Sequence, residues 1–314
     1  MKCAKIVSFI NYKGGVGKTT TTYHVGCSLA FHHGKKILLV DIDPQTNLTF
    51  LCVDYPSWQE FKNNNGTIAT LYHRFQKKLP LQTKKYIWQS AVGHGRSQKI
   101  PNINLLPCDL ELLGEDLGGV SPILPGPPPA NPFQGLQKQA KQTLREWLFL
   151  KEALFEVQND YDYILIDCPP NIYMMTQNAL VASDCYVVTT IPEYLSTIGL
   201  QILTRKVREI GQKVINVANL AGTSGLKVAE LGGIIFVKLR IGRTMITQQH
   251  HGQMAQIQRD FPQHCFESHT TELIGYSEAA ESRLPVWLTG TATARYAAAK
   301  MEYENITTEF LRRF

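Results

Sequence analysis

A glycine-rich loop near the beginning of this 314-residue chain constrains its fold more than any other feature. The apolar run at residues 6–10 predicts a buried β-strand, and the apolar spacing over residues 19–32 predicts an α-helix. The connection between them reads Lys13-Gly14-Gly15-Val16-Gly17-Lys18-Thr19-Thr20. A glycine-rich turn that leads from a strand into a helix N-terminus can close its backbone N–H groups around phosphate oxygens. The loop therefore predicts a phosphate-binding site.

The side chains of this loop suit a nucleoside triphosphate with a metal ion. We expect Lys18 to neutralise the β- and γ-phosphates, the Thr19 hydroxyl to coordinate Mg²⁺ and Thr20 to hydrogen-bond the α-phosphate. The plain P-loop pattern has glycine at the position of Tyr12, and the chain instead carries a second lysine, Lys13, directly before the glycines. A lysine on the outer lip of the loop cannot easily curl back onto its own γ-phosphate when Lys18 occupies that space.

The rest of the chain alternates between predicted strands and helices. Two continuous apolar runs, at residues 37–40 and 163–166, lead into Asp41 and Asp167, and continuous runs are typical of parallel strands covered on both faces. Because Asp167 ends a buried strand beside the loop, we expect it to contact Mg²⁺ through water. We expect Asp41, also at a strand end, to orient the waters bound to the metal. Further strands are predicted at residues 103–106, 185–190, 233–237 and 272–274, and helices at 137–158, 173–182, 196–210, 247–260 and 291–313.

This rhythm predicts an α/β fold with a doubly wound, mostly parallel sheet flanked by helices, as a single P-loop domain over residues 1–314. Two stretches interrupt it. Residues 61–100 carry eight basic residues and no acidic one, and residues 118–135 hold six prolines, which predicts a surface loop. No run of about 18 apolar residues is present to span a membrane, and the N-terminus lacks the apolar region of a secretory signal.

Charge is concentrated in two blocks. Residues 61–100 carry a net +8 and residues 200–245 a net +6, whereas the whole chain carries only +6. A basic face on an otherwise acidic body is typical of proteins that bind phosphate backbones, and a solvated surface is the alternative.

Four segments together with the loop resemble the deviant Walker-box ATPases of the ParA/MinD superfamily. The segment Val40-Asp41-Ile42-Asp43-Pro44-Gln45-Thr46-Asn47-Leu48-Thr49 is similar to the first switch of that family. The segment Tyr161-Asp162-Tyr163-Ile164-Leu165-Ile166-Asp167-Cys168-Pro169-Pro170 is similar to its Walker B strand and second switch. Asn178-Ala179-Leu180 matches the helix that follows, and Tyr276-Ser277-Glu278-Ala279 is similar to the C-terminal pattern. The resemblance covers nearly the whole chain apart from the basic stretch and the proline-rich stretch.

The resemblance implies a role for each matching residue. Lys13 reaches across a two-fold interface to the partner's phosphates, which implies an ATP-dependent homodimer, and Asp43 positions the attacking water. Catalysis then rests on Lys13, Lys18 and Asp43, and the metal on Thr19, Asp43 and Asp167, with ATP and Mg²⁺ as cofactors. Contacts to the nucleotide are also expected from Asp41 and Pro169, and main-chain contacts to adenine from Ser277, Glu278 and Ala279.

Three branches of the superfamily compete. The ParA branch implies a cytoplasmic, nucleoid-associated ATPase that binds DNA without sequence preference and positions cargo, such as a plasmid, a chromosome region or a carboxysome, with an adaptor of ParB or McdB type that stimulates hydrolysis. Its DNA-binding candidates here are Arg205, Lys206, Arg208, Lys213, Lys238, Arg240 and Arg243.

The MinD branch is the alternative and implies a basic amphipathic membrane helix at the C-terminus. The apolar stripe of residues 294–314 instead predicts a helix docked on the core, so we expect no membrane contact. A metallocentre relative is the third branch. Its ligand cysteines stand in glycine-rich loops, and Cys108 and Cys168 lack such surroundings; we expect the seven cysteines to be reduced and mostly buried.

Overall fold

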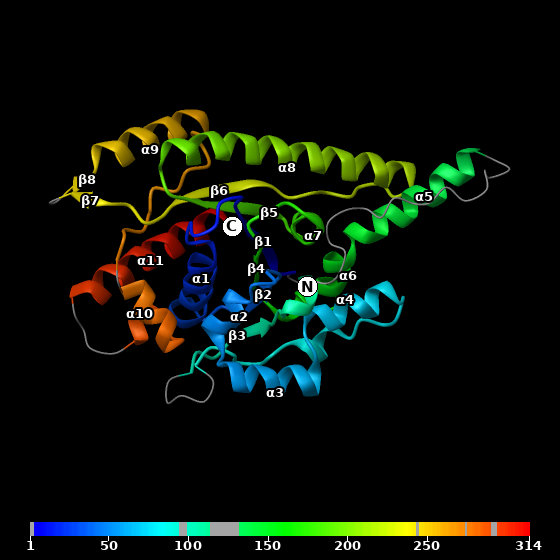
Figure 1. The fold of residues 1–314 in the computed structure, drawn as a ribbon, viewed down its shortest axis with the longest axis horizontal. Helices are drawn as coiled ribbons and strands as arrows, with labels where there is room; N and C mark the ends of the chain where they lie inside the picture. Colours follow the sequence, from blue (N-terminus) through cyan, green and yellow to red (C-terminus); the bar gives the residue numbers. More distant parts are fainter. Residues whose placement is uncertain (1–2, 94–98, 114–131, 243–244, 274, 290–293) are drawn as a thin grey trace.

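The computed structural model describes residues 3–93, 99–113, 132–242, 245–273, 275–289 and 294–314. Six strands form one sheet in the order β3-β2-β4-β1-β5-β6, and every pairing between them is parallel (Figure 1). The strands are β1 (Lys5–Ile10), β2 (Ile37–Asp41), β3 (Ile103–Leu106), β4 (Tyr163–Asp167), β5 (Cys185–Thr190) and β6 (Glu230–Phe236). This sheet, with helices packed on it, confirms the predicted α/β class.

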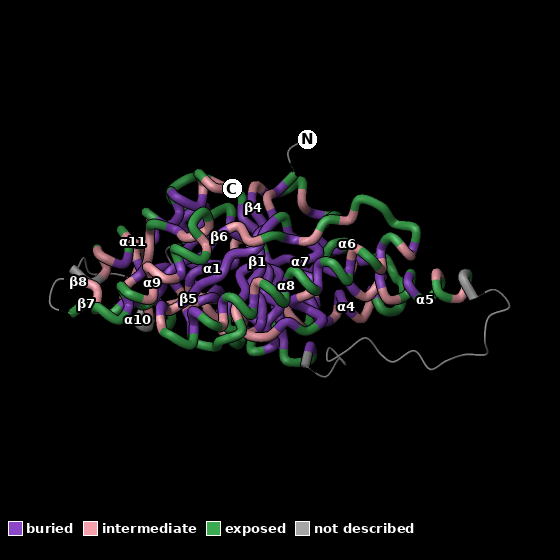
Figure 2. The backbone as a smooth tube through the Cα atoms, turned by 90° about the horizontal axis from the view of Figure 1, so that it is seen from above, coloured by how far each residue is buried: buried purple, intermediate pink, exposed green. Residues whose placement is uncertain are grey.

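Alternate residues of the central strand point into two separate cores. Val7 and Phe9 of β1 pack in a core that also contains residues of α1 (Lys18–His33) and α11 (Ala294–Arg313). Ile6 and Ile10 of the same strand pack on the other face with residues of α7 (Met174–Ala182) and α8 (Tyr194–Leu220). Figure 2 shows the buried strands between the more exposed outer helices. Continuous apolar runs are required because both faces of the sheet are covered.

The remaining helices and the small hairpin lie around this sheet. They are α2 (Asn47–Cys52), α3 (Tyr55–Asn65), α4 (Ile68–Gln76), α5 (Pro132–Trp147), α6 (Phe149–Phe155), α9 (Gln248–Asp260), α10 (Gly275–Ser282), the 3₁₀ turns η1 (Thr83–Tyr86), η2 (Leu110–Leu113), η3 (Gln158–Asp160) and η4 (Val286–Leu288), and the strands β7 (Ile241–Gly242) and β8 (Met245–Ile246).

Helices α2, α3 and α4 were not predicted from the sequence, although two of them carry start signals. The Asp54 side chain accepts a hydrogen bond from the Ser57 amide at the start of α3, and Pro56 stands in the first turn. Thr67 caps α4 in a reciprocal capping box with Thr70. Side-chain acceptors of this kind satisfy the first amides of a helix, which have no partner within it.

The predicted helix over residues 137–158 is wrong as one element, because it breaks at Leu148 into α5 and α6. The buried Asn178 side chain donates to the Glu146 carbonyl and accepts from the Leu150 amide, and so satisfies the backbone on both sides of the break. Such a partner comes from packing rather than from local sequence.

Two further predictions need correction. The strand predicted at 272–274 does not form: Thr271 makes a single bridge to Leu239 and the Glu272 amide donates to the Leu239 carbonyl, with Ile274 outside the described residues. The proline-rich stretch 118–135 is predicted to contain no helix, but α5 begins at Pro132. A proline is tolerated there because the first turn of a helix does not need its backbone N–H. Residues 118–131 lie outside the described part of the chain.

The C-terminal helix lies against the core, as predicted. Ala299, Tyr303, Ile306 and Phe310 are buried along one face of α11, which packs on α1. Among the helices that the structure describes, none is both long and apolar enough to cross a bilayer.

Candidate nucleotide site

The register of the sheet brings the predicted acids to one edge. Asp167 at the end of β4 stands opposite Phe9 on one side and opposite Asp41 on the other. The carboxyl ends of parallel strands meet at the same edge, and ligands of open α/β sheets bind there. The loop of residues 13–17 leaves β1 at this edge, so strand pairing alone places the glycine-rich loop beside both acids.

Lys18, Thr19 and Asp167 form a buried contact at the beginning of α1. The Lys18 ammonium lies 3.0 Å from Asp167 Oδ1, and the Thr19 hydroxyl donates to Asp167 Oδ2 at 2.6 Å. Burial opposes the charge on Lys18, but the carboxylates of Asp167 and Asp43 outweigh it and raise the Lys18 pKa. The Lys18 side chain is therefore held charged in the cavity over the loop.

Asp43 and Asp41 are both buried but have different positions. Asp43 lines the cavity, with Oδ2 3.9 Å from the Lys18 ammonium and Oδ1 accepting from the Gln45 amide at 3.0 Å. Asp41 accepts from the Thr49 amide and hydroxyl and from the Asp43 amide. These contacts hold Asp41 against residues 43–49.

Burial, followed by the neighbouring charge of Asp167, raises the Asp41 pKa to about 7. Burial also raises the pKa of Asp43. Burying a carboxylate costs free energy unless a cation or a hydrogen-bond donor lies beside it. A cation bound at this edge of the sheet would therefore stabilise the charged forms of these acids.

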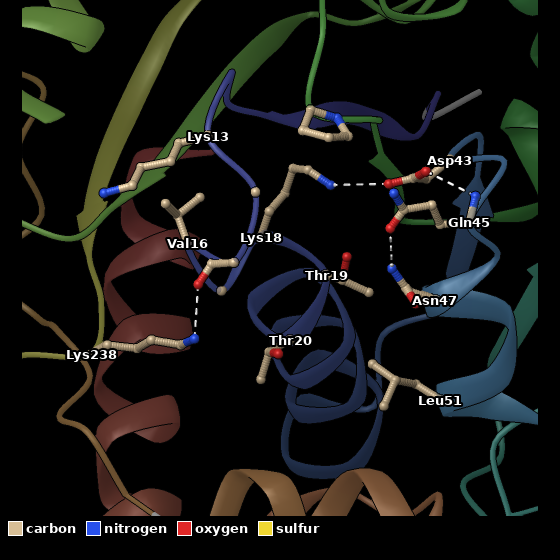
Figure 3. A pocket seen from close by; sticks show the side chains of 14 residues that line it. Lys13, Val16, Lys18, Thr19, Thr20, Asp43, Gln45, Asn47, Leu51 and Lys238 are labelled. Atoms are coloured by element: carbon tan, nitrogen blue, oxygen red, sulfur yellow. Dashed lines mark hydrogen bonds and ion pairs between the residues drawn. The ribbon is translucent and has the colours of Figure 1, made fainter. Parts of the chain in front are cut away.

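A cavity of about 310 Å³ opens over the loop, and Figure 3 shows the side chains around it. Its walls are Lys13, Gly14, Gly15, Val16, Gly17, Lys18, Thr19, Thr20, Asp43, Gln45, Asn47, Leu51, Pro170 and Lys238. All loop residues predicted to contact phosphate are therefore together. Pro169 is buried, and the neighbouring Pro170 lines the cavity instead.

The oxygen groups in this cavity fit Mg²⁺. The Thr19 hydroxyl and Asp43 line the cavity, and Asp167 holds Thr19 from behind. Mg²⁺ prefers oxygen ligands and keeps several waters, so it binds through one or two protein groups together with substrate phosphates. The described residues contain no group of three or more His, Cys, Asp and Glu side chains that could hold a metal ion. Cys108 and Cys168 are buried, and burial raises the pKa of both thiols, which disfavours the thiolate that metals bind.

Lys13 lies on the exposed lip of the loop. Its side chain is 47% exposed, and its ammonium donates to Glu193 Oε2 at 2.7 Å, just before α8. Hydrogen bonding with Lys13 lowers the pKa of Glu193. In this single chain the Lys13 ammonium is therefore held by Glu193.

A second cavity, of about 200 Å³, adjoins the loop on the side of α10. It is lined by Gly17, Thr20, Thr21, Val237, Lys238, Thr270, Tyr276, Ala280 and Tyr303. Of the residues predicted near adenine, Ala279 is buried and does not line this cavity, and the side chains of Ser277 and Glu278 lie outside the described residues. Their neighbours Tyr276 and Ala280 line it.

The predicted DNA-binding residues fall into separate groups. Arg205, Lys206, Arg208 and Lys213 lie on α8, where Arg205 and Lys206 are exposed and approach Glu209 within 4.0 and 3.3 Å. Arg240 is exposed after β6 and lies 3.3 Å from Glu272. Arg243 lies outside the described residues.

Lys238 stands apart from this set, because its ammonium donates to the Gly15 carbonyl at 2.8 Å and so lies at the phosphate loop. Sequence reasoning missed this contact and that of Glu193 with Lys13. Gly15 lies 223 positions from Lys238, and Lys13 lies 180 positions from Glu193. The local sequence around these residues does not indicate contacts at such separations.

Comparison with known proteins agrees with this geometry. A family model described as an AAA domain matches residues 4–119 and 128–220. Sporulation initiation inhibitor protein Soj of Bacillus subtilis is 31% identical over 212 residues, 68% of each chain. Chromosome-partitioning ATPase Soj of Treponema pallidum is 27% identical over 98% of each chain.

Solved structures share the fold at lower identity. An ATP complex of an McdA variant from Cyanothece has a TM-score of 0.66 at 19% identity and covers 99% of this chain and 97% of its own. A plasmid partition protein of Borrelia burgdorferi bound to AMPPNP has a TM-score of 0.62 at 19% identity over 100% of both chains. With the phosphate loop, the two switch segments and the parallel sheet in place, the chain belongs to the ParA/MinD superfamily of P-loop ATPases, within the ParA/Soj-type partition family.

Proposed function

We propose that this protein is an ATP-hydrolysing, ParA-type positioning ATPase. The observation that carries the proposal is the contact of Lys18 and Thr19 with Asp167 at the carboxyl edge of the sheet, with Asp43 lining the same cavity. Lys18 neutralises the β- and γ-phosphates, and Thr19 holds Mg²⁺ with Asp43 and Asp167 nearby. The bound Mg²⁺ supplies charge neutralisation at the phosphates. Asp43 orients the attacking water, because it is the carboxylate that lines the cavity.

ATP then serves as the signal for dimerisation. Lys13 exchanges Glu193 of its own chain for the phosphates of a partner chain. The exposed position of the Lys13–Glu193 pair supports this step, because exposed ion pairs contribute only about 0–1 kcal/mol and exchange readily.

The dimer binds DNA without sequence preference through its basic residues. Exposed cations on α8, chiefly Arg205 and Lys206, and Arg240 after β6 supply phosphate contacts, and Arg243 is retained as a candidate. Pairing doubles the phosphates reached at once, so affinity rises on dimerisation and falls steeply with salt. We place the protein in the cytoplasm on the nucleoid, carrying cargo through an adaptor of ParB or McdB type that stimulates hydrolysis.

The test is fluorescence anisotropy on random DNA duplexes at several salt concentrations, with ATP or ADP. ATP should tighten binding by on the order of a hundredfold through avidity alone. Lys13→Ala should still bind ATP but lose this increase. Arg205→Glu together with Arg240→Glu should lower affinity on every duplex, whereas Lys300→Gln on α11 serves as the matched control. Equal affinity in both nucleotide states, or preference for one sequence, would contradict the proposal.

A further inference from the structure

Lys238 reaches the phosphate loop from the strand at the edge of the sheet. It follows β6 directly, and its ammonium donates to the Gly15 carbonyl at 2.8 Å (Figure 3). Its backbone is fixed in place: the Lys238 amide donates to the Thr270 hydroxyl at 3.2 Å, and a Cβ atom added at Gly17 would contact Val237 at 3.4 Å. Lys238 also adopts the left-handed backbone conformation with φ 53°, which is uncommon for a residue other than glycine. The side chain is therefore aimed at the loop by the fold.

Among the described residues Lys238 has no acidic partner, unlike the other two lysines at this site. Lys13 pairs with Glu193, and Lys18 pairs with Asp167. Within the described part of the chain, no carboxylate lies within 4.0 Å of the Lys238 ammonium. An ammonium carries three N–H donors and no acceptor, and the Gly15 carbonyl accepts one. Two donors therefore remain available for an anion without breaking the contact with the loop.

The location of Lys238 defines which part of a nucleotide it can meet. It lines both the phosphate cavity and the second cavity beside α10, and it shares both with Gly17 and Thr20. Lys18 and Asp43 line the first cavity but not the second. In Figure 3 Lys238 approaches the loop from the side opposite Asp43. It thus lies at the junction between the site expected for the terminal phosphates and the cavity next to Tyr276.

We propose that Lys238 is a phosphate-binding residue that acts within its own chain and contacts the α- and β-phosphates of a bound nucleotide. The proposal rests on the proposed nucleotide-binding function and adds a third cation to it, separate from Lys18 and from the partner's Lys13. Because the contact excludes the γ-phosphate, Lys238 strengthens binding of ADP and ATP alike. It therefore retains nucleotide in the monomer and does not distinguish the two nucleotide states.

The test compares Lys238→Met with Lys238→Arg, and with Lys300→Met as a control of equal chemistry on α11. Calorimetric titration of each protein with ADP and with ATP, at low and moderate salt, should show Lys238→Met weaker than the unsubstituted protein by about tenfold or more for both nucleotides. Lys238→Arg should remain within about threefold, since it keeps the charge. The salt dependence of ADP affinity should become shallower in Lys238→Met, as expected when one exposed cation is lost.

Each other outcome overturns the inference. Unchanged ADP affinity in Lys238→Met removes Lys238 from the site. A loss for ATP alone places it at the γ-phosphate instead. An equal loss in Lys238→Met and Lys238→Arg, with unaltered salt dependence, shows that Lys238 only shapes the loop through Gly15. Failure of the unsubstituted protein to bind either nucleotide overturns the proposed function together with this inference, whereas normal binding with an unaffected Lys238→Met overturns this inference alone.

Discussion

On acidification this protein should lose the stabilising contribution of His24, a buried histidine that joins the phosphate-loop helix to the C-terminal segment. Its Nδ1 lies 2.8 Å from the Thr20 carbonyl, and the Val286 amide lies 3.3 Å from its Nε2. A carbonyl only accepts and an amide N–H only donates, so Nδ1 carries the proton and Nε2 must be free of one. Aromatic rings enclose the imidazole, with Tyr303 stacked on it at 4.5 Å and the rings of Tyr23, Tyr276 and Trp287 at its edges.

The size of the effect follows from the pKa of His24. Burial lowers this pKa from 6.5 to about 4, although the hydrogen bond to Thr20 opposes the shift. Unfolded chains therefore bind a proton that the folded protein rejects between pH 6.5 and pH 4. The stability supplied by neutral His24 is complete above pH 6.5 and is lost as the pH falls towards 4. The full shift corresponds to about 3 kcal/mol, of which about 2 kcal/mol should be lost between pH 8 and pH 5.

Urea unfolding at pH 8, 7, 6 and 5, followed by fluorescence and by circular dichroism, measures this dependence; coincident transitions show that one free energy describes it. His24→Gln should be less stable at pH 8, and the change in its free energy of unfolding from pH 8 to pH 5 should be more favourable by about 2 kcal/mol than the change in the unsubstituted protein. His251→Gln, at an exposed position of α9, should keep the original dependence. Asp41, whose raised pKa of about 7 gives a dependence of opposite sign, is common to all three proteins. Parallel pH curves for His24→Gln and the unsubstituted protein would refute the argument.

Further expectations concern the nucleotide site. Lys18→Ala should abolish ATP binding in a calorimetric titration, and unchanged affinity would remove the loop from the mechanism. Asp43→Ala should bind ATP and Mg²⁺ but hydrolyse ATP about tenfold or more slowly, and accumulate as a dimer in light scattering; a normal rate of phosphate release would contradict this. Glu193→Gln should favour the ATP-bound dimer by up to about fivefold, because the competing pair with Lys13 is worth about 1 kcal/mol at most; weaker dimerisation in analytical ultracentrifugation would show that Glu193 supports the interface instead. Chelation of Mg²⁺ with EDTA should stop hydrolysis, and continued turnover would exclude Thr19 as a metal ligand.

Much of the fold was predictable because its signals are local. Continuous apolar runs identified β1, β2, β4 and β5 within a residue or so, and glycines followed by Lys18 and Thr19 identified the loop. The position of Asp167 beside that loop also followed, since parallel strands bring their carboxyl ends to one edge. Helices α3 and α4 were missed although Asp54 and Thr67 cap them, whereas α2 begins without a side-chain cap.

What the sequence alone determined is the chemistry available at the site: a lysine, a threonine and acids at the ends of buried strands. The tertiary structure alone decided which of these groups meet. It turned Asp41 towards Thr49, joined Lys13 to Glu193 and brought Lys238 to Gly15. It also broke the helix at Leu148, where Asn178 supplies the missing hydrogen bonds. Backbone preferences act over a few neighbouring residues, whereas a contact between residues some 200 positions apart exists only because the packed sheet fixes both partners, and that packing depends on the whole chain.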